Sequence, residues 1–116
     1  MATLKAARQA LAAQIDAAIT DTDVDVLAFD PPTVTAPVVT VATAGVSPTS
    51  WRFTIRIYVD AGQSEQAQDL LDDLLNSVDT LLEPTTPRSS WDWEFDDAKG
   101  MFLMVTTVEY DREDFG

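Results

Sequence analysis

A strictly alternating pattern in the middle of the chain constrains the fold more than any other feature. From Trp51 to Val59, large apolar side chains occupy every second position, and polar side chains or tyrosine occupy the positions between them. Successive side chains of a β-strand point to opposite faces, so the pattern predicts a strand with one buried face. Such a sheet needs a second layer of structure to cover its apolar face.

Two segments with helical periodicity can supply that layer. In residues 4–19, apolar side chains recur every three to four positions, and Thr3 is placed to cap the helix. The second helix is predicted to begin near Ser64, its N-cap, and its apolar stripe runs from Ala67 to Val78.

The second helix is predicted to be interrupted before its last turn. Asn76 and Ser77 favour caps and turns over helix interiors, so we expect a break or kink at this point. Ser77 would then cap a short final turn that Pro84 ends.

Four further segments have the β-branched or alternating composition of strands: residues 24–29, 37–43, 91–96 and 101–110. Residues 43–50 and 97–100 are predicted to be turns or loops. The aromatic residues at every second position of 91–96 are predicted to face the sheet core. The last strand is apolar on both faces in its first half, which places it centrally in the sheet or under a partner. Residues 111–116 are expected to fray.

These elements predict one α+β domain over residues 1–116. Their order is helix, three strands, helix, two strands (α-β-β-β-α-β-β), with two helices packed on one face of a mostly antiparallel sheet of four to five strands. The predicted core packs the apolar face of the alternating strand against both helices: Trp51, Phe53, Ile55, Ile57 and Val59 against Leu11, Ile15, Leu70, Leu71 and Leu74.

The composition removes most catalytic chemistry. Cys and His are both absent, so there is no thiolate nucleophile, no imidazole base and no common ligand of transition metals. A Ser or Thr nucleophile would need a lysine, and nothing places Lys5 or Lys99 beside a hydroxyl. We therefore expect no enzyme, no metal and no cofactor. No apolar stretch approaches the length that spans a membrane, so no membrane partner is expected.

The charge is strongly acidic. Twenty Asp and Glu residues against seven Lys and Arg residues give a net charge of −13, and no basic residue lies between Asp60 and Pro87. A protein that binds the phosphate backbone needs clustered cations, so we expect no direct high-affinity DNA binding. The acidic helix is predicted to repel polyanions.

Five charged residues are candidates for a subunit interface. Arg52 and Arg56 share the polar face of the alternating strand, whereas Asp69, Asp72 and Asp73 lie off the apolar stripe of the second helix. Solvated faces would explain all five charges. The alternative is that the arginines meet carboxylates of a neighbouring subunit.

An alanine-rich first helix and a proline-rich strand pair precede three informative segments: Arg52–Asp60, Gln66–Leu75 and Ser77–Glu83. In this order, these segments resemble the tail terminator or tail-completion (head–tail joining) proteins of long-tailed bacteriophages, above all phages of actinobacteria. The resemblance spans almost the whole chain. The sequence departs from it in the short segment between Glu83 and Trp91 and in its acidic C-terminus.

The resemblance implies a structural virion protein that is assembled in the host cytoplasm and located in the tail or neck. Such a protein forms a homohexameric ring on the major tail tube protein, ends tube polymerisation and offers the surface on which head–tail connector proteins dock. Another connector or neck subunit of the same particle fits the sequence as well. An alternative of a different class is an acidic inhibitor whose carboxylates mimic nucleic acid.

Overall fold

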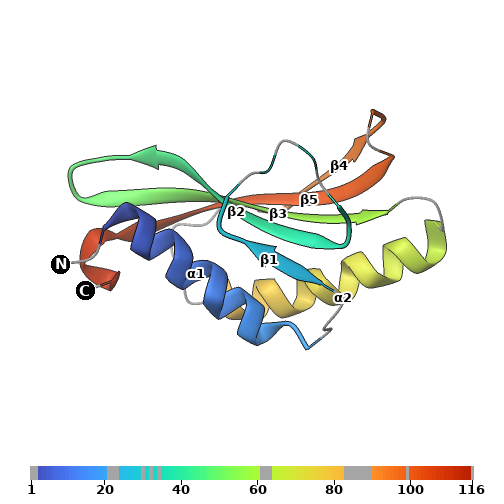
Figure 1. Ribbon diagram of the computed structural model, residues 1–116, viewed down its shortest axis with the longest axis horizontal. Coiled ribbons are helices and arrows are strands. Elements are labelled where there is room, and N and C mark those ends of the chain that lie inside the picture. Colours follow the sequence, from blue (N-terminus) through green and yellow to red (C-terminus); the bar gives the residue numbers. More distant parts are fainter. Residues whose placement is uncertain are drawn as a thin grey trace.

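Both helices of the protein cover the same face of a five-stranded sheet (Figure 1). The computed structural model describes residues 3–20, 24–29, 31, 33, 35–60, 64–82, 90–98 and 100–115. In chain order the elements are α1 (Leu4–Ala18), β1 (Asp25–Leu27), β2 (Val38–Val46), β3 (Ser50–Asp60), α2 (Ser64–Leu82), β4 (Asp92–Asp96), β5 (Met101–Asp111) and the 3₁₀ helix η1 (Arg112–Phe115). The predicted α+β fold class and element order are confirmed.

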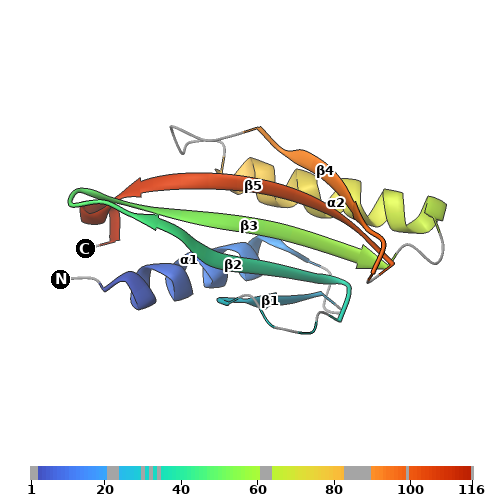
Figure 2. The ribbon, with the colours of Figure 1, turned by 90° about the horizontal axis from the view of Figure 1, so that it is seen from above.

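The strands lie in the order β1-β2-β3-β5-β4, which can be followed from one edge to the other in Figure 2. β1 runs parallel to β2, and the other neighbouring strands are antiparallel. The last long strand, β5, lies between β3 and β4. This central position was one of the two explanations predicted for its apolar faces.

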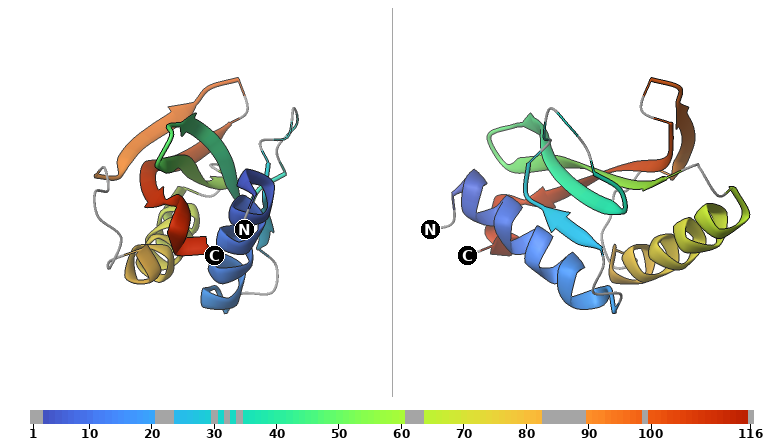
Figure 3. Two further views of the ribbon diagram at one scale, coloured as in Figure 1. Left: turned by 90° about the vertical axis from the view of Figure 1, so that its left-hand side faces the viewer. Right: turned by 45° about the vertical axis from the view of Figure 1, so that its right-hand side comes forward.

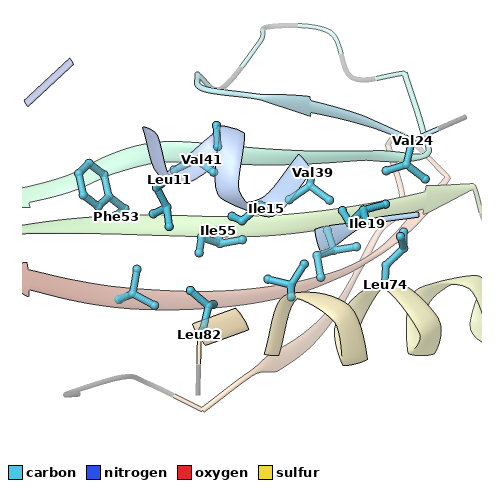
Figure 4. Packing of buried hydrophobic residues seen from close by; sticks show 14 of the residues in the cluster. Leu11, Ile15, Ile19, Val24, Val39, Val41, Phe53, Ile55, Leu74 and Leu82 are labelled. Atoms are coloured by element: carbon cyan, nitrogen blue, oxygen red, sulfur yellow. The ribbon is translucent and has the colours of Figure 1, made fainter. Parts of the chain in front are cut away.

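The core lies between the sheet and the helices, where the alternating strand predicted it (Figure 4). Each of the five predicted β3 side chains is buried, from Trp51 to Val59. Leu11 and Ile15 of α1 and Leu71 of α2 are buried in the same cluster. Leu74 is also buried, and Leu70 packs against the same cluster while partly exposed.

The first helix begins as predicted. The Ala6 backbone N–H donates to the Thr3 hydroxyl at 3.1 Å, so Thr3 caps α1. The second helix begins at Ser64 itself, one residue earlier than the predicted N-cap at Ser64 would place it. The residues before it lie outside the described part of the chain.

The predicted break at Asn76 and Ser77 is wrong, because α2 is one continuous helix. The Ser77 hydroxyl donates to the Asp73 carbonyl at 3.2 Å, which satisfies the hydroxyl inside the helix. Val78 and Leu82 continue the apolar stripe and are both fully buried. Burial of this last turn outweighs the local preference of Asn76 and Ser77. The role expected for Pro84 lies outside the described residues.

The first hairpin is longer than predicted. β2 continues to Val46 and pairs with β3 up to Trp51, which leaves a tight turn at 47–49 in place of a loop over 43–50. A bulge between Thr43 and Gly45 adjusts the register. β1, in contrast, is shorter than the predicted 24–29, because only Asp25–Leu27 pair with β2.

Residues 111–116 were predicted to fray, and this is wrong for residues 111–115. Arg112 binds this segment to the first hairpin. Its backbone N–H donates to the Thr49 carbonyl at 3.1 Å, and its guanidinium donates to the Ser47 carbonyl. The guanidinium also lies over the Trp51 ring, 5.4 Å from the centroid. These contacts hold η1 beside the turn at 47–49.

The opposite face of the sheet carries no helix of the described residues, as the end view in Figure 3 shows. A small apolar cluster of Val38, Tyr58 and Leu103 is buried there, with Leu27 and Ala36 packed against it. We refer to this side of the sheet as the open face. In the described residues, no helix has the length and hydropathy needed to cross a bilayer.

Candidate subunit interface

The structure places Arg52 on the open face, near the end of the first hairpin. It is exposed, and its backbone is in register with Gly45 on β2 and Glu109 on β5. The side chain lies over Gly45, since a Cβ added there would come within 2.5 Å of Nη2. Among the described residues it has no hydrogen-bond or ion-pair partner. The glycine thus leaves room for a guanidinium that is presented on this face.

Arg56 lies further along the same face and is half-buried. Its neighbours across the ladder are Thr40 on β2 and Val105 on β5. The residue lines a shallow hollow together with Tyr58 and Leu103, in the curve of the β4–β5 hairpin. The prediction that Arg52 and Arg56 share one face is therefore confirmed.

The three candidate carboxylates lie on the other side of the molecule. Asp69, Asp72 and Asp73 are all exposed on α2, off its buried stripe. Within the described part of the chain, the Asp72 carboxylate accepts one hydrogen bond, from Gln68 Nε2 at 3.2 Å, and the other two carboxylates accept none.

The arginines and the carboxylates cannot meet within one chain. The sheet separates them, because the arginines lie on the open face. The helix α2 covers the opposite face (Figure 3). Contact between the two sets requires two copies in a head-to-tail arrangement. This geometry matches a heterologous interface, in which different patches of the two subunits meet.

Sequence reasoning missed an aromatic surface on β4. Trp93 and Phe95, predicted to face the core, are 51% and 45% exposed. Both residues face the helix side of the sheet and pair across the ladder with Met104 and Phe102 of β5. They are exposed because β4 is an edge strand. Alternation revealed that they share a face; it contained no information on the position of the strand at the edge of the sheet.

The third aromatic residue of this segment has a structural role. Trp91 packs against the main core, and its indole Nε1 donates to the Asp79 carboxylate of α2 at 3.0 Å. This bond ties the start of β4 to the helix layer. Trp91 is therefore the only one of the three predicted core aromatics in the segment that packs against the main core cluster.

No group of three or more metal-ligating side chains occurs in the part of the chain that the structure describes. Comparison of the sequence with protein-family models and with curated proteins gave no match.

Proposed function

We propose that this protein is a structural subunit of a long-tailed phage that forms a ring on the tail tube, ends its polymerisation and provides the head-docking surface. One observation carries the proposal. Arg52 and Arg56 lie on the open face, and the exposed carboxylates of α2 lie on the opposite side. In one copy the sheet lies between the two sets, so we expect each set to meet the other on a neighbouring copy.

A head-to-tail contact of this kind closes into a ring when the rotation between neighbours divides a full turn. The open face of one subunit would pack on the helix layer of the next. The open face, which carries no helix of the described residues, thereby gains a helix layer. Repeated around the ring, the same contact leaves two different ring faces, one for the tube and one for the head.

The net charge of −13 suits a channel that DNA passes through. A wall with this charge repels the phosphate backbone, so DNA does not adhere to it.

Charge reversal tests the interface. Arg52→Glu with Arg56→Glu should abolish ring formation and let tubes grow past their normal length, because like charges then face each other across the interface. Ring formation is measured by light scattering after size-exclusion chromatography, and tube length by electron microscopy with the tube protein present. Lys5→Glu, an exposed change of the same sign on α1, serves as the control and should assemble normally.

A swap distinguishes a specific contact from a general charge effect. Adding Asp69→Lys and Asp72→Lys to the double arginine variant should restore rings, since the complementary pairs are rebuilt with reversed signs. Rings from the arginine variant itself, or failure of the swap to restore them, would overturn the proposed interface. Normal rings that leave tube growth unaffected would indicate another neck or connector subunit.

A further inference from the structure

β4 ends the sheet with an exposed edge. It pairs with β5 alone, and in the described residues no strand lies beyond it (Figure 2). Such an edge presents unpaired backbone N–H and C=O groups, to which an extended segment can add as a further strand. The side chains of β4 decide which segments are accepted.

One face of β4 is an ordered aromatic surface. Phe102 of β5 lies between the two exposed rings, with centroids 5.4 Å from Trp93 and 5.3 Å from Phe95. An edge strand that served only to prevent pairing would not expose two aromatic side chains. A strand added beside β4 would place its own apolar side chains against the exposed rings of Trp93 and Phe95.

The other face of β4 is acidic. Asp92 and Glu94 are exposed there and have no hydrogen-bond or ion-pair partner in the described part of the chain. Two copies of β4 cannot pair with each other without bringing these carboxylates together. The second edge strand, β1, also carries an acid, Asp25, and neither edge strand has a basic residue.

We propose that the β4 edge binds an extended segment of another protein in which basic residues alternate with apolar ones. The basic side chains would face Asp92 and Glu94, and the apolar side chains would extend the surface of Trp93 and Phe95. Period two places these two sets on opposite faces of the added strand, as β4 requires. The inference concerns β4 alone and does not depend on ring formation.

Short capped peptides test this assignment on the intact protein. The first probe alternates lysine and valine; a second has the same composition with all lysines before all valines. A third carries N-methyl groups on the amides of both edges, so that neither edge can pair with β4. We expect the alternating peptide to bind and to shift the backbone NMR signals of β4. The N-methylated peptide should bind about tenfold more weakly, because it cannot form the ladder.

Variants of the protein test the charge selection. Asp92→Lys with Glu94→Lys should reverse the preference, towards a peptide that alternates glutamate and valine. Asp16→Lys with Glu65→Lys changes the net charge equally, at exposed positions of α1 and α2, and should leave the original preference intact. Equal binding of all three peptides, the alternating one, the one with all lysines before all valines and the N-methylated one, would show only general charge attraction. That result would overturn the proposal. Shifts confined to elements other than β4, or no binding at all, would overturn it as well.

Discussion

At the scale of single residues, Thr40 combines full burial with an unsatisfied hydroxyl. The residue is 0% exposed, on β2 between Leu27 and Arg56, and its Oγ1 has no hydrogen-bond partner in the described part of the chain. A buried hydroxyl without a partner costs free energy, because it gives up its bonds to water. The sequence pattern gave no sign of this cost, since threonine is a favourable strand residue.

Two substitutions of Thr40 measure separately what its hydroxyl and its methyl group contribute to stability. Thr40→Val keeps the shape and removes the hydroxyl, so we expect the free energy of unfolding to rise by about 1 kcal/mol. Thr40→Ser keeps the hydroxyl and removes the methyl group, and should lower it by about 1 kcal/mol. Urea unfolding of both variants measures the two changes. A less stable valine variant would show that the hydroxyl has a partner after all.

At the scale of elements, the contacts between the two helices and β3 define the stability of the domain. Ile55→Ala and Leu71→Ala should each lower the free energy of unfolding by about 2–5 kcal/mol, because each leaves a cavity among fully buried neighbours. Val46→Ala, at an exposed position of the first hairpin, is the control and should change stability by less than about 0.5 kcal/mol. Losses below about 1 kcal/mol at both core positions would contradict this packing.

The sequence predicted those elements whose burial follows a local period. The alternation of Trp51–Val59 and the stripe of α2 each point to a single buried face, and both faces are buried in the structure. Contacts between distant segments were not predictable in the same way. Arg112 orders the C-terminus only because folding brings residues 47–51 beside it, and Trp93 is exposed only because β4 lies at the sheet edge.

In the candidate interface, too, the features that follow a local period were predictable and those that depend on the tertiary fold were not. Period two placed Arg52 and Arg56 on one face, and the helical period placed the α2 acids off the buried stripe. The predicted core already put both helices against the apolar face of β3, on the side away from the arginines, and the structure confirms this. The position of β4 at the edge of the sheet depends on the tertiary fold. For this reason the sequence did not predict that β4 exposes an aromatic surface.

At the scale of the whole molecule, charge is unevenly distributed along the longest dimension of 44 Å, which is horizontal in Figure 1. The end with the first hairpin holds Arg8, whose Nη1 donates to Thr43 at 3.2 Å, and Arg112, which holds the turn at 47–49. The end of β5 and η1 bring the acids Glu109, Asp111 and Glu113 to the same end. At the opposite end, the described residues around the start of α2 carry acids and no base, and Arg56 lines the hollow beside the acids of the β4–β5 turn.

Salt should act on assembly in two opposed ways. Neighbouring copies, each with a net charge of −13, repel one another over a distance that shortens as salt is added. The proposed pairs between the arginines and the α2 acids attract and are also weakened by salt, but at a partly buried contact they are screened less. Repulsion between whole subunits therefore falls faster than local attraction. We expect monomers at low ionic strength and rings at higher ionic strength or on tube ends, measured by sedimentation velocity over a salt series. Rings that form at low salt and dissociate as salt is added would show that local pairs outweigh the repulsion, contrary to this prediction.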